Sequence, residues 1–229
     1  MNKLVVVACR KGGVGKTTVA HAVTDFLDRT GDSPLIFDTD TNNPDVGRVY
    51  NGKRDMKAFI LTTPDDWGHV IDLVEASNRS IVINTPSGSN VDENAGALRV
   101  IAGLGTHKVQ VVMPIDDRQD TFHFVEDLFD ALKPQDGEPG VPLLVLRNLH
   151  YGEPGRFTIL NESKLMHEIK SSGFAEVDDF PKLPDTIKKQ LVDERKTFDE
   201  IAGLGGSGSK YMLQQFRRRV RTVFEGRLG

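Results

Sequence analysis

Short runs of consecutive apolar residues alternate along the chain with longer segments in which apolar residues recur every three or four positions. The apolar runs have the length of buried strands and occupy residues 4–8, 34–38, 80–84, 108–113 and 141–146. The periodic segments are typical of helices and occupy residues 17–28, 65–76, 93–102, 120–132, 162–171 and about 185–191. Continuous apolar strands that alternate with helices predict an α/β fold, with a mostly parallel twisted sheet and helices on both of its faces.

Polar residues follow or end several of the predicted strands. A glycine-rich segment at residues 9–18, Cys-Arg-Lys-Gly-Gly-Val-Gly-Lys-Thr-Thr, comes after the first strand. Asp38 ends the second strand, Asn84 ends the third, and Asn148 follows the fifth. Because ligands of open parallel sheets bind beyond the carboxyl ends of the strands, we expect these residues to converge on one site.

The glycine-rich segment predicts a phosphate-binding loop. Glycines permit positive φ angles and a close approach of the backbone, so that successive N–H groups can surround a phosphate at the N-terminus of the following helix. We expect Lys16 to reach the β- and γ-phosphates and the Thr17 hydroxyl to ligate Mg²⁺. The residues predicted to bind the nucleotide in this loop are Lys11, Gly12, Gly13, Val14, Gly15, Lys16, Thr17 and Thr18.

The loop departs from the usual Walker A pattern, because Arg10 stands in the place of the first glycine and a second lysine, Lys11, follows it. With this lysine, the sequence KGGVGKTT resembles the deviant Walker A P-loop ATPases, the ParA and MinD family. The resemblance implies an ATP-dependent homodimer in which Lys11 reaches the ATP of the partner subunit. It also implies slow hydrolysis of ATP to ADP and phosphate, with catalytic roles for Lys11, Lys16 and Asp40, and an activating partner protein.

Two segments resemble the switch regions of that family. In Asp38-Thr39-Asp40, the resemblance gives Asp38 a role in holding Mg²⁺ through water and Asp40 a role in orienting the attacking water; a solvated turn is the alternative. Residues 81–88 resemble the Walker B region, but Asn84 replaces its aspartate. The predicted metal set is therefore Thr17, Asp38 and Asn84, and we expect weaker Mg²⁺ binding or slower turnover than the family norm.

Two later segments resemble the part of the family's site that holds the base. Asn148 corresponds to an adenine-reading asparagine, because an amide offers both a donor and an acceptor; a turn-forming asparagine is the alternative. Pro181 lies in a segment that resembles the loop over the base. No guanine-specific signal follows, so ATP is favoured over GTP.

The C-terminal residues separate from the rest by composition. We expect an ATPase domain at 1–202, a flexible glycine- and serine-rich linker at 203–209 and a basic amphipathic helix at 210–229, which holds six basic residues and one acidic residue. The helix can pack its apolar stripe on the domain, or insert that stripe into a membrane, which is the less favoured alternative. It can also bind DNA non-specifically; the residues for this are Lys210, Arg217, Arg218, Arg219 and Arg221.

Composition supports one cytoplasmic domain, associated with the nucleoid if the helix binds DNA. The single cysteine, Cys9, excludes an internal disulfide, and no apolar stretch approaches the roughly 20 residues of a membrane span. Because the chain begins at the P-loop strand, we expect no N-terminal DNA-reading domain. The combined features favour a short, plasmid-encoded positioning ATPase used in partition, stability or conjugative mobilisation. A nucleotide-gated binding module with little hydrolysis and a metabolic P-loop enzyme, similar to dethiobiotin synthetase, remain as alternatives.

Overall fold

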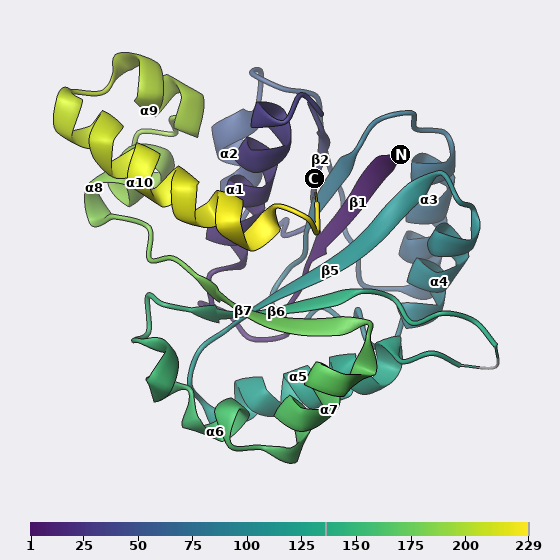
Figure 1. Cartoon of the computed structure of the whole chain (residues 1–229). Helices are drawn as coiled ribbons and strands as arrows, with labels where there is room; N and C mark the ends of the chain where they lie inside the picture. The colour runs from purple at the N-terminus through teal and green to yellow at the C-terminus, as the bar shows by residue number, and fades with distance from the viewer. Residues whose placement is uncertain (136, 229) are drawn as a thin grey trace.

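A single seven-stranded sheet organises the computed structural model, which describes residues 1–135 and 137–228 (Figure 1). The strand order is β3-β2-β4-β1-β5-β6-β7, and every neighbouring pair is parallel. The strands are β1 (Asn2–Val7), β2 (Leu35–Asp38), β3 (Met56–Ala58), β4 (Ile81–Asn84), β5 (His107–Ile115), β6 (Leu143–Asn148) and β7 (Ala175–Phe180). The predicted parallel α/β fold is confirmed.

Helices cover both faces of the sheet, and each face has its own apolar core. On one face lie α3 (Pro64–Glu75), α4 (Ala95–Gly103), α5 (Gln119–Leu132), α6 (Thr158–Asn161) and α7 (Lys164–Ser172). On the other lie α1 (Lys16–Arg29), α2 (Asp45–Tyr50), α8 (Asp185–Val192), α9 (Phe198–Leu204) and α10 (Ser207–Phe224). Alternate residues of β1 enter opposite cores, Leu4 one and Val5 the other, as the period of two in a strand requires.

The two strands that the sequence pattern missed are the edges of the sheet. β3 has only three residues, and β7 reads Ala-Glu-Val-Asp-Asp-Phe, so neither forms a continuous apolar run. Edge strands are only partly covered and tolerate charged side chains, which explains why the apolar pattern did not reveal them. Of the helices missed, α9 has a local signal, because Thr197 and Glu200 form a capping box at its start.

The C-terminal region differs from the predicted linker and helix. Residues 203–209 hold the end of α9, two glycines and the first residues of α10, which begins at Ser207 rather than at 210. A Cβ at position 205 would lie 2.5 Å from the Ile201 carbonyl oxygen, so Gly205 serves a close turn rather than a flexible connection.

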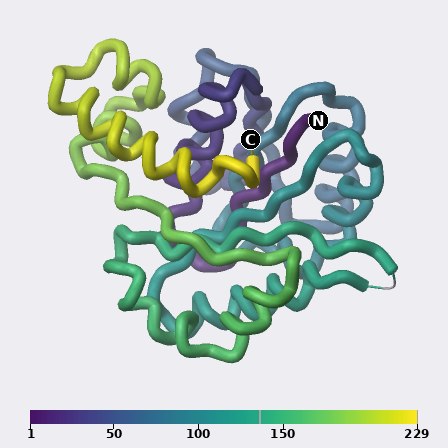
Figure 2. The backbone as a smooth tube through the Cα atoms, viewed as in Figure 1, coloured from purple at the N-terminus to yellow at the C-terminus, as the bar shows by residue number. Residues whose placement is uncertain are grey.

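The backbone of α10 lies beside α1 and β7 (Figure 2), and its apolar stripe packs into the core. Phe216 and Phe224 are 3% and 0% exposed, so the packing interpretation is confirmed and membrane insertion of these two rings is contradicted. None of the helices in the described part of the chain is both long enough and apolar enough to cross a bilayer.

Candidate nucleotide-binding site

The glycine-rich loop joins β1 to the N-terminus of α1, where the sequence placed it. Gly13 and Gly15 have φ angles of 82° and 104°, values at which a side chain would be strained. A Cβ at Gly12 would lie 3.2 Å from the Ser87 hydroxyl oxygen, a tight contact that a larger residue could make only if Ser87 shifted. The loop therefore packs closely on the segment that follows β4.

Lys16 begins α1, and its side chain is directed into the loop. Its Nζ donates to the Lys11 carbonyl oxygen at 3.0 Å and contacts the Ser87 Oγ at 3.4 Å. Burial lowers the pKa of Lys16, and the charges of Cys9 and Asp40 partly oppose this shift. The ammonium thus lies where the loop would hold phosphates, with Asp40 near enough to affect its pKa. Thr17 and Thr18 follow it in the first turn of α1.

Lys11 pairs with two carboxylates of its own subunit, Asp120 in α5 and Asp116 in the segment between β5 and α5. Its Nζ lies 2.5 Å from an Asp120 carboxylate oxygen and 3.4 Å from an Asp116 carboxylate oxygen. The hydrogen bond from Lys11 is the main cause that lowers the pKa of Asp120. Any movement of Lys11 toward a second subunit must therefore break two ion pairs.

Arg10 fastens the loop to two neighbouring segments. Its guanidinium lies 2.5 Å from Asp92 and 3.2 Å from Glu93, both in the stretch before α4, and 3.5 Å from Asp127 in α5. Its carbonyl oxygen also accepts a hydrogen bond from the Gly88 N–H at 2.7 Å. In the sequence, Arg10 was only a departure from the Walker A pattern. Its contacts involve residues more than 70 positions away, so no local pattern could predict them.

Asp38 and Asn84 form a buried pair at the carboxyl ends of β2 and β4, where they are partners in the strand register. Asn84 Nδ2 donates to Asp38 Oδ1 at 3.0 Å, and the Gly47 N–H donates to Asp38 Oδ2 at 2.7 Å. Burial raises the pKa of Asp38, and these hydrogen bonds oppose the rise. Because the amide faces Asp38 with its nitrogen, Asn84 Oδ1 is turned elsewhere and is buried without a partner among the described residues.

This arrangement fits a magnesium ion bound largely by water and phosphate. An unpartnered buried carbonyl oxygen suits a metal-bound water, which can donate to it, and Asp38 supplies a negative charge beside it. Within residues 1–135 and 137–228, no three His, Cys, Asp or Glu side chains gather to hold a metal. Mg²⁺ does not require such a cage, since it retains several waters and binds through substrate phosphates. The residues present, with the Thr17 hydroxyl, therefore fit the ion.

The Asn148 side chain stabilises the loop through a hydrogen bond to its backbone. Its Nδ2 donates to the Val14 carbonyl oxygen at 2.8 Å, and its Oδ1 accepts from the His150 N–H at 3.1 Å. A Cβ on Gly15 would clash with this amide, which explains the third glycine of the loop. Both ends of the Asn148 amide are thus hydrogen-bonded within the chain, and its adenine-reading role stays a prediction.

Two further residues follow β6 and β7, the strands at this end of the sheet. Pro181 is buried directly after β7, whose last residue is the register partner of Asn148, and its place over a base stays a prediction. Tyr151 donates its hydroxyl to the Gly13 carbonyl oxygen. A single tyrosine after a strand carries no sequence signal of such a contact, which depends on a residue 138 positions earlier.

Comparisons with known proteins agree with this geometry. No family model matches the chain. MobD of Acidithiobacillus ferrooxidans is 28% identical over 219 residues, which cover 94% of this chain and 93% of MobD.

Three solved proteins share the architecture at low sequence identity. A Borrelia burgdorferi protein described as a plasmid partition protein and bound to AMPPNP matches with a TM-score of 0.64 and 11% identity over 100% of both chains. The ParA of pNOB8 matches with a TM-score of 0.61 and 12% identity over 99% of both chains, and its complex with nonspecific DNA with a TM-score of 0.56. MinD of Pyrococcus horikoshii with Mg-ADP matches with a TM-score of 0.55 and 15% identity over 98% of both chains. The chain therefore has the fold of the ParA/MinD deviant Walker A P-loop ATPases.

Proposed function

We propose that this protein is an ATP-dependent, dimerising switch ATPase that positions or segregates cargo, with plasmid DNA as the favoured cargo. The observation that carries the proposal is that the two loop lysines have different positions and partners. Lys16 lies inside the loop, whereas the Lys11 side chain pairs, among residues 1–135 and 137–228, with the carboxylates of Asp116 and Asp120. The resemblance to MobD favours mobilisation over partition or stability among the plasmid roles.

The proposed cycle begins when ATP enters the loop. The phosphates replace the Lys11 carbonyl oxygen as the acceptor for Lys16 Nζ, and the backbone N–H groups at the start of α1 bind them further. Bound Mg²⁺ would neutralise phosphate charge, with the Thr17 hydroxyl, Asp38 and Asn84 holding its shell. Asp40 orients water near the γ-phosphate. A second subunit offers Lys11 a phosphate in exchange for its two carboxylate partners.

The DNA contact requires one correction. Arg217 was predicted to bind DNA, but its side chain is only 9% exposed and its guanidinium binds Asp25 and Asp199. Four predicted cations of α10 remain for phosphate contacts: Arg218, Arg219 and Arg221, which are exposed, and Lys210, which is half-buried. The DNA complex of the structurally similar pNOB8 ParA supports a DNA matrix.

Steady-state ATP hydrolysis with Mg²⁺, measured with and without plasmid DNA, tests the proposal, and a Lys16→Ala variant is the control. Slow turnover that DNA raises and that the control abolishes supports a DNA-matrix ATPase. Tight ATP binding without turnover would support the nucleotide-gated binding module instead, which the neutral Asn84 beside Asp38 favours. A Lys16→Ala variant that keeps both ATP binding and turnover would contradict the ATPase and the binding module alike.

A further inference from the structure

A groove of about 610 Å³ runs between α1 and α10. It uses the C-terminal half of α1, from Asp25 to Thr30, whereas the phosphate-binding loop adjoins the other end of this helix. The groove is therefore separate from the nucleotide site. Its volume is in the range of sites that take ligands or peptide side chains.

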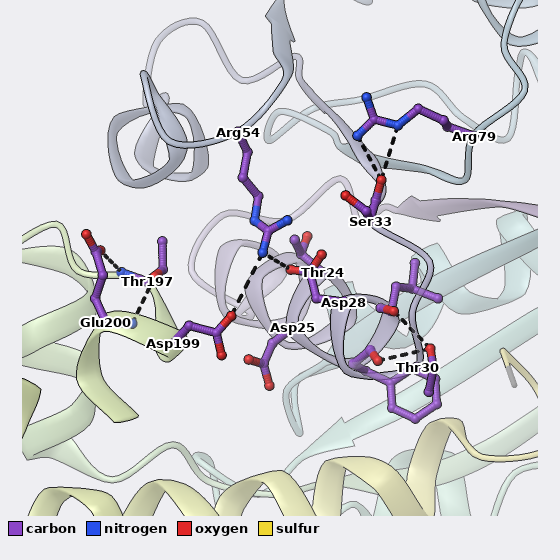
Figure 3. A network of polar contacts seen from close by, with 12 residues as sticks. Thr24, Asp25, Asp28, Thr30, Ser33, Arg54, Arg79, Thr197, Asp199 and Glu200 are labelled. Atoms are coloured by element: carbon purple, nitrogen blue, oxygen red, sulfur yellow. Dashed lines mark hydrogen bonds and ion pairs between the residues drawn. The ribbon is translucent and has the colours of Figure 1, made fainter. Parts of the chain in front are cut away.

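Ion pairs fix the walls of the groove. Arg217 of α10 donates from Nε and Nη2 to the two carboxylate oxygens of Asp25 in α1, and its Nη2 also lies 2.8 Å from Asp199 of α9. Arg54 binds Asp28 of α1 at 2.7 Å and approaches Asp199 (Figure 3). Because these contacts join three helices around the groove, a ligand would meet a preformed surface and would lose little affinity to ordering it.

The lining carries a local excess of positive charge. It holds five cations, Arg29, Lys210, Arg217, Arg218 and Arg221, against the two carboxylates of Asp25 and Glu225. Arg217 is paired with Asp25 and Arg221 with Glu225. Among the described residues no carboxylate pairs with Arg29, Lys210 or Arg218, in a protein whose net charge is −4. Three cations therefore remain to attract an anionic partner.

The groove also offers apolar surface. This surface is small: Phe26, Leu213 and Val220 contribute to the lining from below its charged side chains and are 6%, 0% and 3% exposed. Tyr211 is 62% exposed and precedes Arg218 by seven residues, which places both on one side of α10 at the edge of the groove. Exposed tyrosines beside arginines are enriched where proteins meet partners.

We propose that this groove binds an acidic, amphipathic segment of a partner protein. Carboxylates of the segment would pair with Arg29, Lys210 and Arg218, and its apolar side chains would contact Phe26 and Tyr211. Lys210, Arg218 and Arg221 are also candidates for the DNA contact of the proposed function, but duplex DNA fits the groove itself less well, because phosphates gain nothing from an apolar lining and meet the carboxylates of Asp25 and Glu225. The proposal needs no nucleotide, so it can fail or hold independently of the ATPase cycle.

The test uses the full chain without nucleotide and a fluorescein-labelled synthetic peptide of about 18 residues, with Glu on one helical face and Leu on the other. A scrambled isomer of the same composition and a labelled DNA duplex are the comparison probes. We expect the patterned peptide to bind at least about tenfold more tightly than the isomer, because apolar contacts require the pattern. Arg218→Glu is expected to weaken binding about tenfold or more, since it removes an attraction and adds a repulsion.

Arg219→Glu is the matched control, because Arg219 is exposed on α10 but does not line the groove. It makes the same change in charge and is expected to alter peptide binding less than about twofold. Lys210→Glu repeats the test at the other end of the lining, and circular dichroism checks that each variant is folded. Equal binding of the isomer, equal losses in Arg218→Glu and Arg219→Glu, or no binding of the patterned peptide would each overturn the proposal. Tighter binding of the duplex, lost in Arg218→Glu alone, would make the groove a nucleic-acid site and would also overturn it.

Discussion

Replacing Asn84 by aspartate restores the residue usual in the resembled family, and the structure predicts that this change destabilises the metal-free protein. The amide nitrogen of Asn84 lies 3.0 Å from Asp38 Oδ1, and both residues are buried. Two carboxylates at that distance repel each other by roughly 5 kcal/mol at an effective dielectric constant of 20. Protonating one carboxyl group avoids the repulsion, but at pH 7 this costs about 4 kcal/mol for a group of ordinary pKa. The free energy of unfolding should therefore fall by up to about 4 kcal/mol.

The loss in Asn84→Asp has a characteristic pH dependence. One carboxyl group of the folded variant has a pKa raised above its unfolded value, so the deficit is absent below that unfolded value and grows as pH rises toward the folded pKa. Relative to wild type, we expect a deficit of about 1.5 kcal/mol at pH 5 and about 4 kcal/mol at pH 7.

Urea unfolding at the two pH values measures this deficit. Asn84→Ala is the control, because it removes the amide without adding charge. Loss of the Asn84 hydrogen bond lets the pKa of Asp38 rise further, so this variant should also lose stability as pH rises from 5 to 7, but by less than Asn84→Asp does. Mg-ATP should recover part of the loss in Asn84→Asp, since the ion neutralises both carboxylates. A variant as stable as wild type at pH 7, or one with a pH-independent deficit, would show that the pair does not repel as the geometry requires.

Three further predictions concern other buried contacts. His21 is fully buried with neither ring nitrogen bonded among the described residues, and burial lowers its pKa to about 3. As pH is lowered below 6.5, only the unfolded chain takes up this proton, so the free energy of unfolding should fall by about 1.4 kcal/mol for each pH unit. In urea titrations, His21→Leu should remove this pH dependence. Arg217→Ala leaves a buried carboxylate unpaired and should cost about 3–5 kcal/mol, whereas Arg219→Ala should change unfolding by less than about 0.5 kcal/mol; equal effects in calorimetry would contradict the assignment. Gly15→Ala should abolish ATP binding in calorimetric titration without unfolding the chain, because the new methyl group meets Asn148 and the backbone is strained; unchanged affinity would count against the loop geometry.

The nucleotide site could be predicted from the sequence because its parts are local. A glycine-rich loop between a strand and a helix, and polar residues at strand ends, are placed by the topology of a parallel sheet. Contacts between distant segments could not be predicted in this way. Arg217 had every local feature of an exposed basic residue, yet its partner Asp25 lies 192 positions earlier. Asn148 had the position of a base-reading residue, but its nitrogen binds Val14, 134 positions away. The Arg217 contact contradicts its predicted DNA role, whereas the role of Asn148 toward a base stays a prediction; in both cases the long-range partner could not be read from the local sequence.

The most direct test of the proposed switch is the mass of the protein in solution, measured by sedimentation with no nucleotide, with Mg-ADP and with Mg-ATP. The proposal predicts a monomer in the first two conditions and a dimer with Mg-ATP. It also predicts that Lys11→Ala binds ATP but remains a monomer. A wild-type mass that is the same in all three conditions, or a Lys11→Ala variant that dimerises like wild type, would contradict a switch in which Lys11 leaves Asp116 and Asp120 for the nucleotide of a second subunit.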